Sequence, residues 1–297
     1  MRLSPIAVVT ALMLAAATPA AAETFRFVAM GDLPYTKTED YSGFDNVIVE
    51  VNSRRPAFSI HVGDIKSGSS PCTDAAFLAI RDRFDHFDAP LFYTPGDNEW
   101  TDCHRRKAGD FDPHERLVRL RALFFSQAMS FGRRPRAYVR QADTGVHVQM
   151  VENAIWRQGN VRFATIHVVG SNNGRKARVA HMLEYQQRDA ANADWIATAF
   201  NEAKGLESQA LVLAFHANPD FDGGFFSRPD ESGFTGTLAA LTRAAADFGK
   251  PVLLIHGDTH DLTIDQPLKG PDGAVLKNVT RLEVYGAPKV GAVEVTV

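Results

Sequence analysis

The sequence predicts an α/β protein built on a parallel or mixed β-sheet, with a second sheet completed near the C-terminus. Short apolar, β-prone runs alternate with amphipathic helical segments, which is typical of βαβ units. Five of the apolar runs end in a segment that carries Asp or His, and an open α/β sheet binds its ligands at such strand ends. The last two segments, 281–285 and 290–297, alternate in polarity and are predicted to pair with each other as antiparallel strands of the second sheet.

The first third of the chain supplies three strands and two helices. Strands are expected at residues 25–30, 58–62 and 91–94, which are short runs rich in aromatic and aliphatic residues. Helices are expected at residues 41–54 and 74–87, where apolar residues recur every three or four positions. The order of these elements predicts parallel strands with their carboxyl ends at one edge of the sheet.

Residues 101–160 interrupt this pattern with many charges and a Gly/Arg/Pro-rich stretch. We interpret them as an insertion beside the site, within one domain of residues 23–297, and we expect a helix at 114–127. The alternation then resumes with strands at 161–169, 211–215 and 251–255 and helices at 184–204 and 238–248.

Residues 1–22 are expected to be a secretory signal peptide. Arg2 gives a positive start, residues 6–17 are apolar, and three alanines precede Glu23 as a cleavage site. The apolar stretch is too short for a stable membrane span, and no later segment has the length and hydrophobicity of one. We therefore expect an exported, periplasmic protein, with an uncleaved N-terminal anchor as the alternative.

The composition is that of a globular protein, with 45% hydrophobic and 23% charged residues. The formal net charge is -3, and no basic block indicates a nucleic-acid-binding surface. An anionic substrate would have to be attracted locally, by metal and by arginine, although charged loops are more often solvated surface. The oligomeric state stays open. The arginines that could reach a phosphate are Arg105, Arg106, Arg133, Arg134 and Arg136.

Only two cysteines occur, Cys72 and Cys103. In an oxidising compartment an isolated pair is more often a disulfide than a zinc site. Each cysteine follows one of the strand-end segments, so a bond between them would join two loops and stiffen the site. The alternative is a pair of free thiols.

The five strand-end segments carry metal-binding side chains. A single Gly-Asp is compatible with an ordinary turn, but acids and histidines at five strand ends predict a carboxylate and imidazole cluster. Mixed oxygen and nitrogen donors suit Zn, Fe, Mn or Co. The segments are GDLPY, HVGDIK, PGDNEW, FHAN and HGDTH, and the predicted metal ligands in them are Asp32, Asp64, Asp97, His216, Asp258 and His260.

The order and spacing of these segments resemble the calcineurin-like metallophosphoesterases, whose five motifs read D-x-H, G-D, G-N-H-D/E, H and G-H-x-H. The resemblance extends over residues 25–285. It implies a four-layer fold, in which two mixed β-sheets pack as a sandwich flanked by helices. It also implies two divalent or trivalent metal ions, with Mn, Fe or Zn preferred. The implied activity is hydrolysis of a mono- or diester in a small phosphorylated substrate, by a hydroxide that bridges the metals.

Four positions depart from the motifs of that family. Pro34 stands where the first motif has a histidine ligand, and Tyr35 is the nearest other donor. Asp97 replaces an asparagine ligand, and Asp258 replaces a histidine ligand. The resulting donor set is more acidic than the family pattern, which favours harder cations such as Mn or Mg over Zn.

The fourth departure concerns catalysis. Asn98 stands where relatives have a histidine that protonates the leaving group or holds the phosphate. An amide cannot act as a general acid, but it can donate a hydrogen bond to a phosphoryl oxygen, so Asn98 is the predicted catalytic residue. His61, His104 and His256 lie in or beside the motifs and are candidate surrogate acids, since histidine titrates near neutral pH.

Two other functions are compatible with parts of the sequence. A degenerate member of the fold could bind a ligand or partner without turnover, as the substitutions at Pro34 and Asn98 allow. An exported solute-binding protein would also have a signal peptide and α/β alternation. That function gives no reason for acids and histidines at five strand ends.

Overall fold

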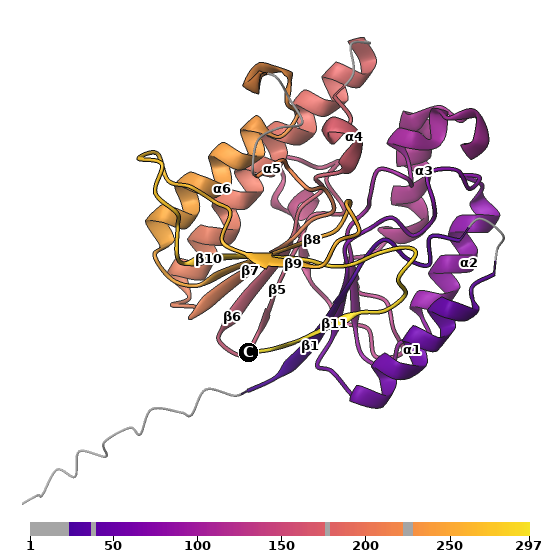
Figure 1. Ribbon diagram of the computed structural model, residues 1–297, viewed down its shortest axis with the longest axis horizontal. Helices are drawn as coiled ribbons and strands as arrows, with labels where there is room; N and C mark the ends of the chain where they lie inside the picture. The colour runs from indigo at the N-terminus through magenta and orange to yellow at the C-terminus, as the bar shows by residue number, and fades with distance from the viewer. Residues whose placement is uncertain (1–23, 37–39, 176–178, 222–227) are drawn as a thin grey trace, which may run out of the picture.

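The computed structural model describes residues 24–36, 40–175, 179–221 and 228–297. The predicted signal peptide, residues 1–22, lies outside the described residues. Two β-sheets pack face to face, and helices cover their outer faces (Figure 1). The predicted sandwich of two mixed sheets flanked by helices is thus confirmed.

The first sheet has four strands and lies against three helices. These elements are β1 Arg26–Met30, β2 Ser59–His61, β3 Leu91–Tyr93, β11 Val293–Thr296, α1 Ser42–Arg54, α2 Asp74–Phe84 and α3 Pro113–Phe124. The strand order is β11–β1–β2–β3. Strands β1, β2 and β3 are parallel, and β11 runs antiparallel to β1. The carboxyl ends of the three parallel strands therefore meet at one edge of the sheet.

The second sheet has seven strands in the order β4–β5–β6–β7–β8–β10–β9, and α5 and α6 pack on its outer face. Strands β6, β7, β8 and β10 are parallel, while β4, β5 and β9 pair antiparallel at the two sides. The bounds are β4 Val139–Arg140, β5 Ala154–Gln158, β6 Val161–Thr165, β7 Ala210–Ala214, β8 Val252–His256, β9 Thr263–Asp265, β10 Val279–Glu283, α4 Gly170–Asn173, α5 Val179–Gly205 and α6 Thr235–Phe248.

The segment between the two halves, residues 101–160, is not confined to the surface. It contains α3 and three short 3₁₀ helices, Thr101–His104, Arg106–Ala108 and Gln141–Thr144. It also supplies β4 and β5, which extend the seven-stranded sheet: β5 pairs antiparallel with β6, and β4 pairs antiparallel with β5. The fourth 3₁₀ helix, Pro229–Glu231, precedes α6.

The predicted pairing of the two C-terminal segments is wrong. β10 lies parallel to β8 in the seven-stranded sheet, and β11 crosses to the other sheet and pairs with β1. Alternating polarity marks a half-buried strand but does not specify its partner. The chain between these strands, residues 284–292, passes from one sheet to the other.

Aromatic side chains fill the space between the sheets. Phe58 stacks on Phe27 at 5.2 Å and meets Phe163 edge-on at 5.0 Å between ring centroids. Phe92 stacks on Trp156 at 3.7 Å. These contacts join strands of both sheets, so the relative position of the two strand edges is set by a rigid core.

The helices follow the expected patterns. α1 directs Phe44, Val47 and Ile48 to the sheet, and α3 begins at Pro113 with a capping bond from the Glu115 N–H to Asp112 Oδ1 at 2.9 Å. None of the helices in the described part of the chain combines the length and hydrophobicity that a bilayer span requires.

A buried ionic cluster connects α3 to the seven-stranded sheet. The Glu152 carboxylate accepts hydrogen bonds from Arg121 at 2.6 and 3.1 Å and lies 2.5 Å from His167 Nδ1. Glu152 and His167 are buried. Burial alone would raise the pKa of Glu152, but the charges of Arg121 and His167 lower it. Burial lowers the pKa of His167, although Glu152 acts in the opposite direction.

We therefore expect the free energy of unfolding to decrease as the pH drops below about 6.5, and to decrease further as it drops below about 4.5. The unfolded chain takes up protons on His167 and then on Glu152 in these ranges, whereas both groups resist protonation in the folded protein. Glu152→Gln leaves Arg121 without its carboxylate and is expected to lower the free energy of unfolding by about 3 kcal/mol at pH 7. It should also weaken the pH dependence of the free energy of unfolding below pH 4.5.

Urea denaturation at several pH values measures both effects. The matched control is Glu50→Gln, which breaks the exposed Arg54–Glu50 pair on α1 and should cost less than about 0.5 kcal/mol. Equal effects of the two substitutions would show that the buried cluster does not stabilise the fold.

Candidate metal centre

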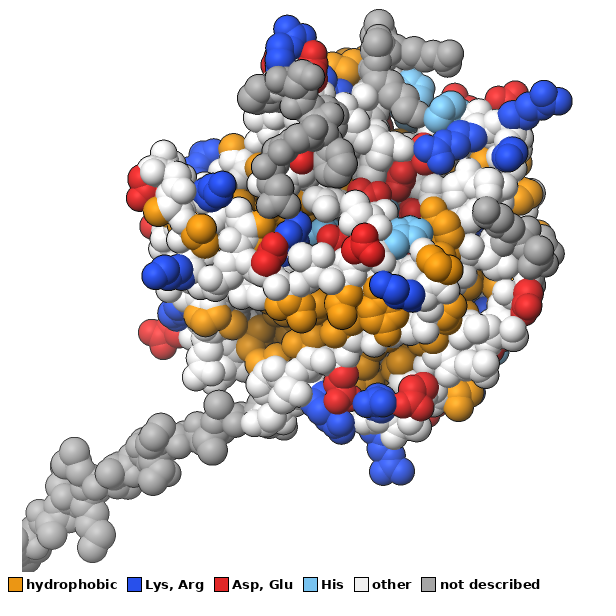
Figure 2. Space-filling view, in the orientation of Figure 1, with side chains coloured by type: hydrophobic (Ala, Val, Ile, Leu, Met, Phe, Trp, Pro, Cys, Tyr) orange, Lys and Arg blue, Asp and Glu red, His pale blue; other side chains and the backbone are white. Residues whose placement is uncertain are grey.

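The predicted ligands lie where the carboxyl ends of the two sets of parallel strands meet. Three of them follow β1, β2 and β3, and the other three follow β7 and β8. Figure 2 shows acidic and histidine side chains close together on one face, above a band of hydrophobic side chains. The possible ligand atoms form two groups, and within each group they lie within 4.8 Å of one another. The first group is Asp32, Asp64 and His216, and the second is Asp97, His216 and Asp258.

The loops that carry these residues hold one another in place. The Asp32 N–H donates to the carbonyl of Gly63 at 2.9 Å, and the Gly257 N–H donates to that of His216 at 2.9 Å. The Asp258 N–H in turn donates to Asp32 Oδ2 at 3.2 Å. One hydrogen-bonded network therefore connects loops from both sheets.

Several ligand positions have a left-handed backbone. Asp32, Asp64 and Asp258 have φ values of 53°, 56° and 83°. Non-glycine residues rarely adopt this conformation, and Asp and Asn tolerate it best. Gly96 allows the next loop to approach, because a Cβ there would lie 2.5 Å from the Asp64 backbone nitrogen. The Gly-Asp pairs thus bend the chain sharply at the strand ends and aim carboxylates into the cluster.

His216 faces three carboxylates. Its Nδ1 lies 2.8 Å from the carbonyl of Val62, which orients the ring and leaves Nε2 free for a cation. Nε2 lies 3.3 Å from Asp64 Oδ1, 3.1 Å from Asp97 Oδ1 and 3.8 Å from Asp258 Oδ1. We call this four-residue group the His216 position.

His260 lies beside Asp32 in the same way. Its Nδ1 is 2.6 Å from the carbonyl of Ala287, and its Nε2 is 3.4 Å from Asp32 Oδ1. Asp32 in turn lies within 4.8 Å of Asp64 and His216. We call Asp32, Asp64 and His260 the His260 position, which His260 joins through Asp32. Pro34 offers no donor there, so this position has three side chains against four in the other.

The buried negative charge perturbs the titration of the cluster. Burial raises the pKa of Asp64 well above its ordinary value, and raises that of Asp258 to about 7. Burial would lower the pKa of His216, but Asp64 and the hydrogen bond with Asp97 raise it. Burial opposes ionisation of Asp97, yet His216 lowers its pKa.

This donor set fits a pair of metal ions. Four carboxylates converge, and their partners are imidazoles, an amide, a hydroxyl and backbone N–H groups. A cation would replace the protons that the cluster otherwise holds, which is how metal binding is coupled to pH. Asp64 lies within 4.8 Å of both Asp32 and His216 and is the bridging candidate.

Asn98 supports Asp64. Its backbone N–H donates to Asp64 Oδ1 at 3.1 Å, and its side-chain amide donates to Asp64 Oδ2. The side chain is buried, and its Oδ1 faces Gly68, where a Cβ would lie 2.6 Å away. One of the two amide N–H groups is thus used on a ligand carboxylate, so Asn98 holds Asp64 in place.

The three candidate surrogate acids differ in their surroundings. His61 is fully buried with Nε2 2.8 Å from the carbonyl of Leu33, and burial lowers its pKa to about 4. His256 is also fully buried, and burial lowers its pKa to about 3. His104 is exposed and lies 2.7 Å from the carbonyl of Thr101. Burial therefore disfavours the protonated form of the first two.

Sequence reasoning missed Ser171, which lies in the GSNNG loop after β6. Its hydroxyl lies 2.9 Å from Asp97 Oδ2 and 2.8 Å from Asp102 Oδ1. The loop approaches closely at Gly170, where a Cβ would lie 2.6 Å from the Oδ1 atoms of Asp97 and Asp258. The available signal was a Gly-flanked polar loop at a strand end, without an acid or a histidine.

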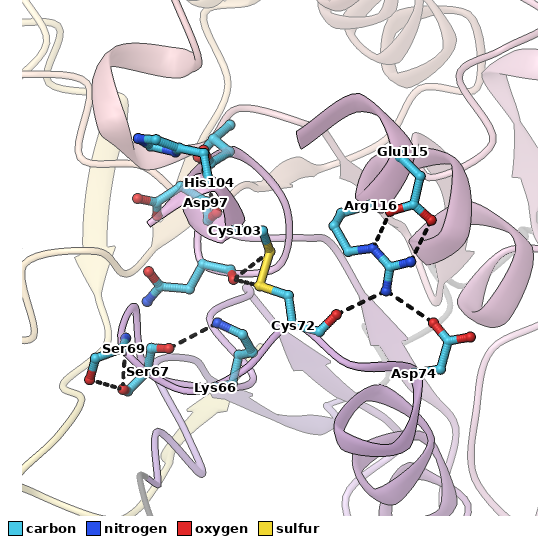
Figure 3. The surroundings of a disulfide bond; sticks show 12 residues. Lys66, Ser67, Ser69, Cys72, Asp74, Asp97, Cys103, His104, Glu115 and Arg116 are labelled. Carbon is cyan, nitrogen blue, oxygen red and sulfur yellow. Dashed lines mark hydrogen bonds and ion pairs between the residues drawn. A yellow bond between two sulfur atoms is a disulfide. The ribbon is translucent and has the colours of Figure 1, made fainter. Parts of the chain in front are cut away.

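Cys72 and Cys103 form a disulfide, as predicted (Figure 3). Their Cα atoms are 5.8 Å apart, and both sulfur atoms lie 3.6 Å from the carbonyl oxygen of Asn98. The bond joins the loop after β2 to the 3₁₀ helix that follows the β3 loop. It therefore contacts the backbone of the residue that holds Asp64.

Comparisons with known proteins agree with this architecture. No protein-family model matches the sequence, and no curated protein is significantly similar to it. A dimetal phosphatase from Danio rerio is similar in structure, with a TM-score of 0.55 and 13% identity over 88% of this chain and 87% of the other. A purple acid phosphatase from yellow lupin (Lupinus luteus) seeds has a TM-score of 0.48 and 13% identity over 93% of this chain and 50% of its own. The chain shares the fold of the Danio rerio dimetal phosphatase.

Proposed function

We propose that this protein is a metal-dependent phosphoesterase that hydrolyses an ester of a small phosphorylated substrate. The observation that carries the proposal is the convergence of four carboxylates and two imidazoles from strand ends of both sheets. The Danio rerio protein is described as a dimetal phosphatase, but 13% identity supports a shared fold alone. The proposed activity therefore rests on the metal-binding side chains of this protein.

Two metal ions would be held at the positions defined above, the first by Asp64, Asp97, His216 and Asp258 and the second by Asp32, Asp64 and His260. Such a pair supplies a nucleophile at neutral pH and stabilises the charge that develops on the phosphate. The oxygen-rich set favours Mn or Fe, with Zn as the third choice. Because the His260 position has fewer donors, we expect it to bind its ion more weakly.

Asn98 cannot act as a general acid, and burial disfavours the protonated forms of His61 and His256. In enzymes that have a general acid, protonation of the leaving group raises the reaction rate by about 10²- to 10⁴-fold. Esters with good leaving groups need it least, so they should be the better substrates. Four carboxylates also offset the charge of two divalent ions, which favours a monoanionic diester over a dianionic monoester.

Metal-reconstituted protein tests the proposal. We expect about two equivalents of Mn²⁺ bound with unequal affinities, and hydrolysis of bis(p-nitrophenyl) phosphate faster than of p-nitrophenyl phosphate at pH 8. Calorimetry and metal analysis measure the first, and release of p-nitrophenol measures the second. Metal binding without turnover of either ester would favour the non-catalytic alternative. Faster hydrolysis of the monoester would contradict the charge argument but not the function.

We also infer export to the periplasm. The disulfide supports it, because such bonds persist in oxidising compartments. Mass spectrometry of the protein recovered from a bacterial periplasm should give a chain that starts near Glu23. A chain recovered with residues 1–22 attached would contradict cleavage.

A further inference from the structure

Arg105 lies near Asn98, the residue that supports Asp64, and is held there by a buried acid. Its Nη2 lies 2.6 Å from Asp102 Oδ2. The Asp102 side chain is 3% exposed, whereas that of Arg105 is 49% exposed. The carboxylate is thus fixed inside the protein, and the guanidinium group keeps a face that is open to solvent.

The acid that holds Arg105 is connected to the metal centre through Ser171. The Ser171 hydroxyl lies between Asp102 Oδ1 and Asp97 Oδ2, at 2.8 and 2.9 Å. Both oxygens of Asp102 are therefore used, one toward the ligand Asp97 and one toward Arg105. This chain of contacts fixes the guanidinium group relative to the His216 position.

Gly68 leaves room for the guanidinium group next to Asn98. A Cβ on Gly68 would lie 2.6 Å from Arg105 Nη1 and 2.6 Å from Asn98 Oδ1. These two atoms are therefore neighbours across a residue that has no side chain. Nη1 therefore lies close to the residue that holds Asp64.

The other arginines considered from the sequence lie elsewhere. Arg133 and Arg134 bond to Asp88, which precedes β3 and so lies toward the amino ends of the strands. Arg136 bonds to Gln158 at the end of β5. Arg106 is exposed on the next 3₁₀ helix. Arg105 is thus the one of these five whose guanidinium group adjoins Asn98.

We propose that Arg105 binds the non-reacting phosphoryl oxygens of the substrate, with Asp102 as the residue that positions it. The inference rests on the proposed function and identifies a group that recognises the phosphate. Guanidinium is suited to this task because it stays charged at all relevant pH values and presents several N–H donors in a fixed plane. One N–H is used on Asp102, and the others are directed by that bond.

Binding of inorganic phosphate to the Mn²⁺-loaded protein tests the inference, with calorimetry as the readout. Arg105→Gln is expected to weaken phosphate binding by about tenfold or more and to raise KM more than it lowers kcat. Arg105→Lys should retain part of the phosphate affinity that Arg105→Gln loses, because lysine keeps the positive charge but lacks the planar set of N–H donors of a guanidinium group. Arg106→Gln is the matched control and should leave affinity and activity unchanged.

A purely structural role would give a different pattern. If Arg105 only neutralises Asp102, Arg105→Gln would lower the melting temperature and leave phosphate affinity intact, which would overturn the inference. The double variant Asp102→Asn with Arg105→Gln removes the pair without leaving a buried charge, and it should still bind phosphate weakly. Normal phosphate affinity in that variant would also overturn it.

The two proposals fail separately. Mn²⁺-loaded wild-type protein that binds phosphate through Arg105 but hydrolyses no ester would end the proposed function and leave the inference standing. If the wild-type protein hydrolyses esters and Arg105→Gln changes neither KM nor phosphate affinity, the proposed function stands and the inference about Arg105 is overturned. Wild-type protein that shows no saturable phosphate binding would count against the inference.

Discussion

Asp64→Asn is expected to lower kcat/KM for bis(p-nitrophenyl) phosphate by about 10³-fold or more, since Asp64 lies beside both Asp32 and His216 and is the candidate bridge between two metal ions. Asparagine keeps an oxygen for the Asn98 amide, and it tolerates the left-handed backbone at this residue, where φ is 56°. The fold should therefore survive, while the charge that draws two cations together is lost. Kinetics and metal analysis on the same preparation measure the effect.

The same substitution should stabilise the protein when chelator is present. Burial raises the pKa of Asp64, so ionisation of this carboxyl disfavours the folded state as the pH rises above the ordinary value near 3.8. At pH 7 an asparagine avoids that cost, and we expect a gain of about 0.5 to 2 kcal/mol. Loss of activity together with a gain in stability is the signature of a functional carboxylate.

Unfolding in urea with EDTA, and again with Mn²⁺, separates the two effects. Wild-type protein should gain stability from Mn²⁺, and the variant should gain much less. Asp82→Asn, at an exposed position of α2, is the control and should change neither quantity. A variant that binds two equivalents of Mn²⁺ as tightly as wild type would remove Asp64 from the bridging role.

Loss of the disulfide is expected to cost about 3 to 4 kcal/mol of stability, because the bond closes a loop between residues 31 positions apart. The double variant Cys72→Ala with Cys103→Ala avoids a leftover thiol. Both sulfurs contact the carbonyl of Asn98, so the loop that supports Asp64 should also lose order. We therefore expect weaker Mn²⁺ binding as well as a lower midpoint of denaturation.

Reduction of the wild-type protein by a thiol-free phosphine provides the matched comparison. Reduced wild type and the double variant should show the same shift in midpoint and in Mn²⁺ affinity. If the midpoint falls while Mn²⁺ affinity stays constant, the disulfide stabilises the fold without supporting the metal centre.

The cluster of possible ligands could be predicted because it depends on local signals and one topological rule. Gly-Asp or His after an apolar run marks a strand end, and parallel strands bring such ends to one edge of a sheet. Asp32, Asp64 and His216 follow β1, β2 and β7, and the structure brings them within 4.8 Å. Chain order alone was enough to place residues that are far apart in sequence.

Other parts of the structure depend on geometry that no local pattern encodes. Ser171 reaches Asp97 only because residues 171–173 adopt three consecutive left-handed conformations. Asp102 turns inward because a 3₁₀ helix follows the β3 loop. The alternating pattern of β11 shows a strand with one buried face, but nothing in it names β1 as the partner.

The pairing of β11 with β1 also bears on how this chain can be rearranged. Residues 25 and 297 exchange backbone hydrogen bonds of 3.2 and 2.9 Å, so the two strands that carry them begin and end side by side. A short linker between these positions would yield a circularly permuted chain, with new ends at the exposed turn around Gly145. In such a chain β1 and β11 become a hairpin, and their pairing joins residues that are close in sequence.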